Sequence, residues 1–239
     1  MLLLALHPHL TGLPTNPPAN HNNTIQGSRT DQLKHEAILI EILQRVIATG
    51  FRALTSSLHD APSTPTVPAD LVLLTSLLQS ILKHPALRLS QQQLALTFAS
   101  QGTIRHATSL FSWAESLSTQ NTNGNKGDPI YADLSVLFLL ELSSIPAIAE
   151  TMAVEGVLAS LSTASIMAYF RRNAGVGPFD APAGAARMYS VWARGLLPLC
   201  LNLLRAVGHP VAPEIAAFLN QYPKPVSYTH LTLPTNREV

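Results

Sequence analysis

Residues that could bind a metal or perform catalysis are few and scattered in this sequence. His7 and His9 form an HxH pair, which could supply two metal ligands, but no third ligand stands nearby. An HExxH signature and an acidic cluster are both absent, and serine, histidine and aspartate show no arrangement that assigns them catalytic roles. The sequence therefore predicts no catalytic, cofactor-binding or metal-ligating residue, and it favours a protein that is not an enzyme.

The segment 171–184 combines arginines with glycines, a composition that could in principle bind an anion. Its glycines fit neither GxGxxG nor a P-loop, no strand precedes it and it lacks lysine, so phosphate binding is not expected. Arg171 and Arg172 follow an expected helix, whose C-terminal dipole favours cations. A structural role for the two arginines is therefore favoured over an anion site.

Two further residues are interpreted as packing rather than function. Cys200 is the single cysteine, so no internal disulfide can form, and its apolar surroundings predict an inert thiol in a reducing compartment. Trp113 lies in an expected helix, and we favour core packing over a role as a recognition aromatic.

Composition narrows the possible partners. Hydrophobic residues make up 46% of the 239 residues and charged residues only 12%, so much of the surface is expected to contact another protein. The formal net charge of +1 offers no electrostatic basis for binding nucleic acid or an anionic membrane.

The stretch 134–170 dominates the expected core. Residues 134–149 are almost wholly apolar, but they fall short of the roughly 20 residues that a membrane span requires. Ser144 is expected to cap a helix that begins near Pro146, Gly156 to form a corner, and Ser162 or Thr163 to cap the next helix. Such short apolar helices indicate either an α-solenoid or an irregular helical bundle.

An amphipathic helix is predicted from Thr30 or Asp31 to about His59, with a possible bend at Gly50. Its apolar stripe comprises Leu39, Leu43, Val46, Ile47, Phe51, Leu54 and Leu58, and its opposite face comprises Glu41, Arg45, Ala48, Arg52 and Thr55. We interpret the opposite face as a solvated flank, with a binding surface as the weaker alternative.

Further helices are expected on either side of the central stretch. One opens at Ala69 or Asp70 and ends at His84-Pro85, and the next begins with a capping box of Ser90 and Gln93. A strongly apolar helical region covers 185–207, which Gly195 and Pro198 should bend or split. A last helix is expected over 210–222.

The predicted organisation is a single domain over residues 1–223, part of a longer array, with loops near 14–27, 61–68, 118–128 and 171–184. Residues 224–239 lose helical periodicity and resemble read-through from a cloning adaptor. We expect this non-native-looking tail to be disordered or loosely attached.

The run from Ala185 to Pro223, together with FRRNAGVGPFD at 170–180, resembles the C-terminal part of the nucleoporin 188 family, and the resemblance covers about 134–223. The residues that carry this resemblance are Trp192, Arg194-Gly195, LPLCLNLL at 197–204 and the segment 214–221. The Asn- and Pro-rich loops look like those of a filamentous-fungal member. The sister inner-ring scaffold nucleoporin is the nearest competing family.

This resemblance implies an all-α solenoid of stacked antiparallel helices, armadillo- or HEAT-like, located in the nuclear pore complex at the nuclear envelope. It implies an inner-ring scaffold without catalytic residues, cofactors or a membrane span, whose C-terminal region binds a helical segment of a linker nucleoporin. The alternative is a module like nuclear transport receptors that binds FG-repeat nucleoporins.

Overall fold

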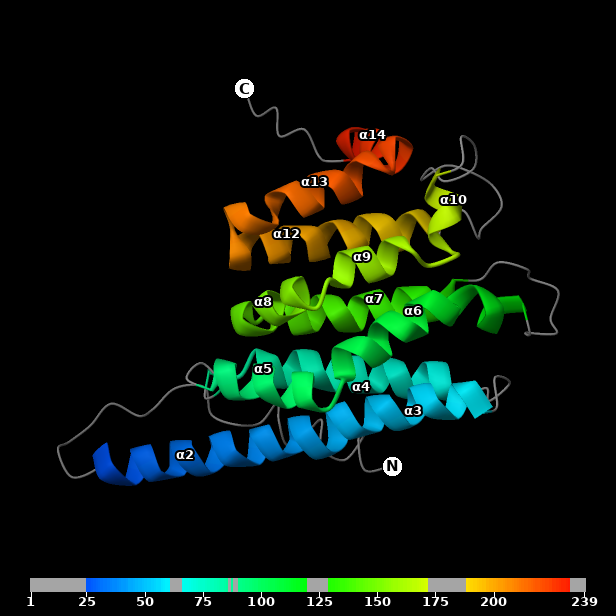
Figure 1. The fold of residues 1–239 in the computed structure, drawn as a ribbon. Helices are drawn as coiled ribbons and strands as arrows, with labels where there is room; N and C mark the ends of the chain where they lie inside the picture. Colours follow the sequence, from blue (N-terminus) through cyan, green and yellow to red (C-terminus); the bar gives the residue numbers. More distant parts are fainter. Residues whose placement is uncertain are drawn as a thin grey trace. The chain divides into compact units, whose positions relative to one another are not determined.

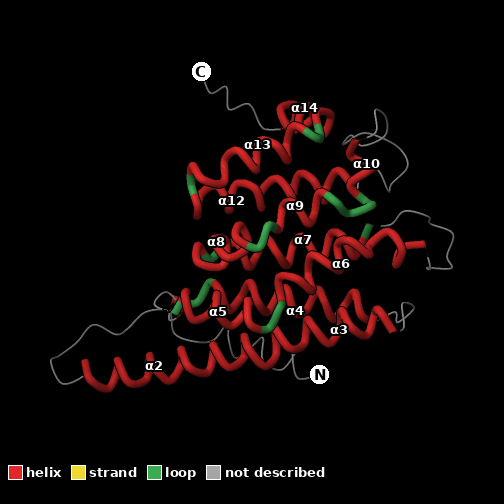
Figure 2. The backbone as a smooth tube through the Cα atoms, viewed as in Figure 1, coloured by secondary structure: helices red, strands yellow, loops and turns green. Residues whose placement is uncertain are grey.

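The computed structural model describes residues 25–60, 66–85, 87, 90–119, 129–171 and 188–232. Within these ranges every regular element is helical and none is a strand (Figure 1, Figure 2). No helix in the described ranges is long and apolar enough to cross a membrane. The fold is an all-α solenoid of stacked helices, as predicted. The residues group into two compact units, Met1–His106 and Ala107–Val239, which are described in turn.

The first unit contains one long helix and three shorter ones. Its elements are α2 (Ile25–Ile42), the π-helical η1 (Leu43–Ala48), α3 (Thr49–Asp60), α4 (Val67–Leu82), α5 (Gln91–Ser100) and the start of α6 (Thr103–Thr119). The first three form one uninterrupted helix over 25–60, which confirms the predicted amphipathic helix with an earlier start. The helix passes through Gly50 without a break, and its departure from α geometry lies in η1 instead.

The π-helical turn changes which face of the long helix is buried. A π-turn holds more residues than an α-turn and therefore rotates the residues that follow it. Ala48 and Thr55, which the periodicity places on the solvated face, are both buried, so that assignment is wrong. The buried Thr55 hydroxyl is satisfied because it donates to the Phe51 carbonyl at 3.0 Å.

The start of α5 also differs from the expected cap. Ser90 is the N-cap residue, but its side chain makes no capping hydrogen bond. Its hydroxyl donates instead to the Glu36 carboxylate of α2, so the predicted capping box with Gln93 does not form. A tertiary contact has replaced a local one. Helix α5 ends at Ser100, and Gly102 just beyond it has a left-handed φ of 64°.

The second unit is built from short helices. Its elements after α6 are α7 (Ile130–Ser143), α8 (Pro146–Val154), α9 (Val157–Ser162), α10 (Met167–Arg171), η3 (Val191–Leu196), α12 (Leu197–Val207), η4 (His209–Val211), α13 (Ala212–Asn220) and α14 (Pro223–Thr232). Helix α12 packs against α7 and α8, and α13 packs against α9. Gly156 forms the predicted corner before α9, with a φ of 66°.

The serine caps predicted in this unit are wrong. The Ser144 hydroxyl donates to the Glu141 carbonyl at 2.6 Å, at the C-terminal end of α7, and Ile145 occupies the N-cap of α8. Ser162 and Thr163 donate backwards to the carbonyls of α9. In each case the hydroxyl satisfies a carbonyl at the end of the preceding helix rather than an N–H of the next.

Residues 188–207 form one continuous helix, which is not split at Gly195 or Pro198. The π-helical η3 leads directly into α12, and Pro198 is the second residue of α12, so the missing N–H of the proline falls just after the change from π to α geometry. Gly195 allows this helix to approach α7 closely, because a Cβ at this position would overlap the Val136 side chain.

Residues 224–232 of the tail belong to the helix α14, contrary to the expectation of a disordered or loosely attached segment. Helix α14 packs against α10 and α13, and Pro225 within it is buried. The Val226 N–H donates to the Tyr222 carbonyl at 3.3 Å, which ties α14 to the end of α13. The non-native origin of residues 224–239 and the single domain over 1–223 both stay predictions.

The expected loops lie largely outside the described residues. Ile25 belongs to α2, Val67 to α4, Thr119 to α6 and Arg171 to α10, so these helices extend to the edges of the expected loops. His7 and His9 also lie outside the described residues.

Candidate partner-binding groove

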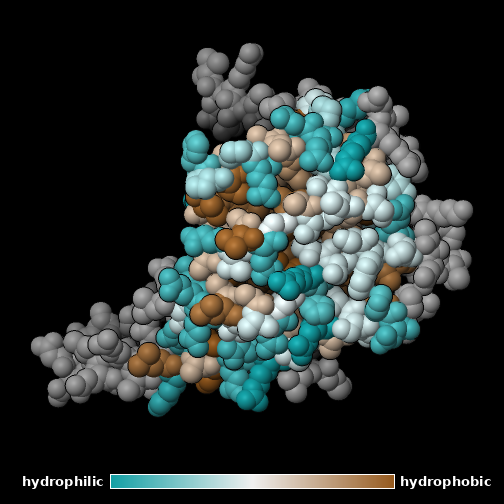
Figure 3. All heavy atoms as spheres, in the orientation of Figure 1, coloured by the Kyte–Doolittle hydropathy of each residue, from teal (hydrophilic) through white to brown (hydrophobic). Residues whose placement is uncertain are grey.

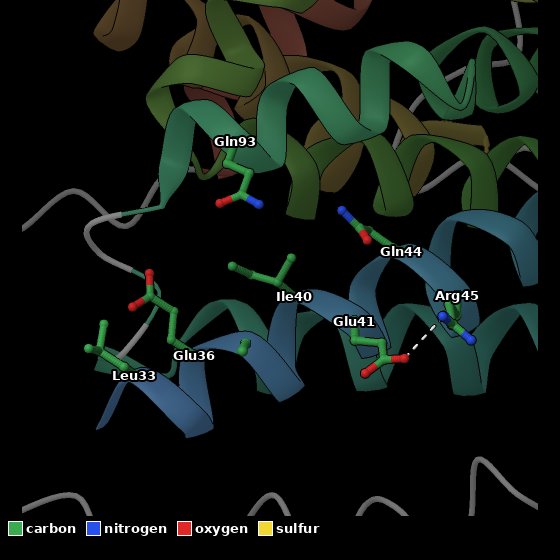
Figure 4. Close-up of a pocket in the computed structure, with 8 residues that line it drawn as sticks. Leu33, Glu36, Ile40, Glu41, Gln44, Arg45 and Gln93 are labelled. Atoms are coloured by element: carbon green, nitrogen blue, oxygen red, sulfur yellow. Dashed lines mark ion pairs between the residues drawn. The ribbon is translucent and has the colours of Figure 1, made fainter. Parts of the chain in front are cut away.

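An open groove of about 460 Å³ lies on the first unit between α2 and α5 (Figure 4). We call it the α2–α5 groove, and it is lined by Leu33, Glu36, Ala37, Ile40, Glu41, Gln44, Arg45 and Gln93. All but Gln93 follow one face of the continuous helix formed by α2 and η1, at steps of three and four residues. The groove therefore runs along a helix rather than enclosing a small molecule.

The apolar part of the α2–α5 groove comes from Leu33, Ala37 and Ile40, which recur at i, i+4 and i+7. Leu33 is 58% exposed, and Ile40 is half-buried. This face does not belong to the core stripe of the long helix, which passes through Leu39 and Leu43. It is a second apolar stripe that the fold leaves open to solvent.

Polar side chains in the groove are already hydrogen-bonded within the unit. Gln44 donates from Nε2 to Thr97 Oγ1 of α5 at 3.0 Å, and Glu36 accepts a hydrogen bond from the Ser90 hydroxyl. In Figure 4 the side chains of Gln44 and Gln93 extend toward the same space as Ile40. A partner that supplies apolar side chains suits such a lining, because few groove atoms need a new hydrogen bond.

Glu41 and Arg45 form an ion pair at the edge of the groove, with Arg45 Nε 3.1 Å from Glu41 Oε1 (Figure 4). Both side chains are exposed and lie at i and i+4, a geometry that stabilises a helix by less than about 1 kcal/mol. The sequence places this pair on a solvated flank. The pair is exposed as expected, and it also lines the groove, which periodicity could not reveal.

No metal centre accompanies the groove. Within the described ranges, no group of three or more histidine, cysteine, aspartate or glutamate residues could hold a metal ion.

Arg171 has the structural role that the sequence favours, but at a different helix end. Its Nη2 donates to the carbonyl of Ser162, the last residue of α9, at 2.6 Å, and to Gln221 Oε1 at 3.1 Å. It also donates to the Tyr222 hydroxyl at 3.2 Å. The guanidinium therefore joins α9 to the end of α13 rather than interacting only with its own helix. Arg172 lies outside the described residues.

The two tryptophans differ in burial. Trp113 is 36% exposed on α6, so the expectation of core packing does not hold for it. Trp192 is fully buried and contacts the rings of Phe170, Phe218 and Tyr222. Both lie in helices with apolar neighbours, and only the packing of the second unit distinguishes them.

Cys200 is buried in α12, as predicted, and burial is the main reason that the pKa of its thiol is raised to about 12. A raised pKa leaves little thiolate at pH 8, so the thiol should be nearly unreactive. We expect iodoacetamide to label Cys200 at least about 100-fold more slowly in native buffer than in denaturant, as measured by mass spectrometry. Equal rates in the two conditions would show that α12 opens readily.

A family model described as the nuclear pore protein NUP188 C-terminal domain matches residues 1–237. The chain belongs to the Nup188 family. The resemblance predicted from the sequence is thereby confirmed, and the choice between this family and its sister scaffold is decided. Membership places this nucleoporin in the nuclear pore complex at the nuclear envelope, as expected. The match also includes most of the tail, residues 224–237.

Curated relatives of this Nup188-family chain are fungal nucleoporins. Nucleoporin NUP188 of Chaetomium thermophilum is 44% identical over 202 residues, which cover 77% of this chain and 11% of the relative. Nucleoporin nup184 of Schizosaccharomyces pombe is 26% identical over 200 residues, covering 82% of this chain and 12% of the relative. The chain thus spans about a tenth of the length of these relatives. Their origin agrees with the expected filamentous-fungal source.

A solved structure supports both the fold and the family. The Nup188 fragment of Myceliophthora thermophila superposes with a TM-score of 0.68 at 39% sequence identity. The match covers 93% of this chain and 63% of that fragment.

Proposed function

We propose that this segment is part of a non-enzymatic scaffold in the inner ring of the nuclear pore complex. In this proposal it binds an amphipathic helix of a linker nucleoporin in the α2–α5 groove. The observation that carries the proposal is the solvent-open apolar stripe of Leu33, Ala37 and Ile40 beside α5. Family membership supports the nuclear pore setting, and the groove supports the mode of binding.

The physical argument for a helical ligand rests on hydrogen bonding. A helix satisfies its own backbone groups, whereas an extended peptide needs partners for them. The described residues of this unit offer no sheet edge, and Glu36 and Gln44 already bond within the unit. From Leu33 to Ile40 the stripe extends about 10 Å, or about two helical turns, which suits i, i+4 and i+7 anchors on a partner helix.

The test is a calorimetric titration of this chain with a purified inner-ring linker nucleoporin fragment. The double variant Leu33→Glu, Ile40→Glu is expected to weaken binding about 10- to 30-fold, because it places charges where apolar anchors must dock. Ile38→Glu is the matched control, since Ile38 is also an exposed apolar residue of α2 but does not line the groove. If the double variant binds as tightly as the control, the groove is not the site.

An FG-repeat peptide, added in a parallel titration, distinguishes the alternative partner. We expect no saturable binding of the FG peptide in the α2–α5 groove. If the FG peptide binds and loses affinity with Leu33→Glu, Ile40→Glu while the linker fragment does not, the groove serves FG recognition and the proposal is wrong.

A further inference from the structure

The outer face of α12 carries a second apolar surface, on the unit Ala107–Val239. Leu197, Leu201 and Leu204 recur at i, i+4 and i+7, and Arg194 and Arg205 flank them. We call these five residues the α12 ridge. The buried face of the same helix is formed by Leu199, Cys200 and Leu203. The helix is therefore apolar on two sides, although one of them faces solvent.

The exposure of the α12 ridge is large for leucine side chains. Leu201 is 58% exposed and Leu204 is 37% exposed, while Leu197 is half-buried. Val154, at the end of helix α8, which packs against α12, is 88% exposed. Figure 3 shows apolar side chains gathered over α12 and beside α8. Large apolar side chains exposed on one helix face are typical of a protein-binding site.

The two arginines of the ridge give the surface its charge. Arg194 and Arg205 are eleven residues apart, about three helical turns, so they lie on the same side of the helix about 16 Å apart along the axis. Both are exposed, and within the described ranges neither has a carboxylate partner. Glu150 is exposed, but it belongs to the neighbouring helix α8 and is not one of the ridge residues. The ridge is thus an apolar stripe with two unpaired positive charges along one edge.

We propose that the α12 ridge binds an acidic amphipathic helix of another polypeptide. Leucine-like side chains of that helix would pack between Leu197, Leu201 and Leu204, and its glutamates or aspartates would pair with Arg194 and Arg205. This surface lies in the other unit from the α2–α5 groove, so the inference does not depend on the proposed function. The two surfaces would allow the segment to hold two helices at once.

Charge complementarity favours this occupant over others. A second copy docking through the same face would place arginine opposite arginine, which is unfavourable. Two arginines are too few for stable attachment to an anionic membrane, which usually requires a larger cluster of basic residues. The apolar side chains of an acidic amphipathic helix would cover the leucines of the ridge, and its carboxylates would pair with the two arginines.

The test uses a designed monomeric helical peptide with leucines at i, i+4 and i+7 and glutamates along one flank, titrated by fluorescence anisotropy into the whole chain. Arg194→Glu, Arg205→Glu is expected to weaken binding at least 10-fold, and a peptide with lysines in place of the glutamates should recover affinity for that variant. Leu201→Glu should weaken both peptides. Circular dichroism checks that each variant keeps its helix content.

Any one of four outcomes would overturn the α12 ridge proposal. The glutamate and lysine peptides could bind the unaltered chain equally, the arginine variant could bind the glutamate peptide without loss, or no peptide could bind at millimolar concentration. Val72→Glu, at an exposed apolar residue of α4 in the other unit, is the matched control and should change nothing. If Leu33→Glu, Ile40→Glu abolished peptide binding instead, the peptide would occupy the α2–α5 groove. In that case the proposed function would stand and the ridge proposal would fail.

Discussion

Replacing Trp192 with alanine is expected to lower the free energy of unfolding of the second unit by about 3–5 kcal/mol. Trp192 is fully buried at the centre of an aromatic cluster. Its ring centroid lies 5.5 Å from that of Tyr222, 5.8 Å from Phe170 and 6.3 Å from Phe218. These partners come from α10, α13 and the residue just before α14, so the substitution would leave a cavity where four segments meet.

Denaturant titration followed by far-UV circular dichroism measures this effect without relying on tryptophan fluorescence. Trp113→Ala is the matched control, because Trp113 is partly exposed and its loss should cost far less. Trp192→Phe should be milder than Trp192→Ala, since it keeps a ring and removes an indole N–H that has no hydrogen-bond partner in the described structure. If Trp192→Ala and Trp113→Ala shifted the midpoint equally, the cluster would not be a centre of stability.

Gly195→Ala is expected to destabilise the second unit by about 2–3 kcal/mol, although alanine normally stabilises a helix interior relative to glycine by about 1 kcal/mol. An added Cβ would overlap Val136 Cγ1 and lie only 3.2 Å from Val136 Cβ. Val136 is a fully buried residue of α7, and its β-branched side chain has little rotamer freedom. The two helices would have to move apart, which would loosen the contact between η3 and α7.

Gly50→Ala is the matched control for Gly195→Ala, because its added Cβ would meet Leu74 Cδ2 at an ordinary 3.5 Å. We expect Gly50→Ala to be neutral or to stabilise the first unit by up to about 1 kcal/mol. The double variant Gly195→Ala, Val136→Ala should be less destabilised than the sum of the two single variants, as measured in a double-mutant cycle. Additive effects would show that Val136 is not what restricts residue 195.

The helical class, the family and many helix positions could be predicted from the sequence, because periodicity and local turn chemistry act over a few residues. The long helix over 25–60, the corner at Gly156 and the buried Cys200 illustrate this. The serine caps failed because a hydroxyl can bond to either neighbouring helix end, or, like that of Ser90, to a distant carboxylate. Local patterns do not distinguish these partners.

The two proposed binding surfaces depended on tertiary structure. Leu33 and Ile40 resemble core residues by type, and only the placement of α5 beside α2 leaves them lining an open groove. Leu201 and Leu203 stand two residues apart in one apolar run, yet one is exposed and the other buried. The sequence of a helix that is apolar on most sides is enough to predict that it packs against other helices. Which side is covered depends on the neighbouring helices, since burial is set by contacts between segments distant in the chain.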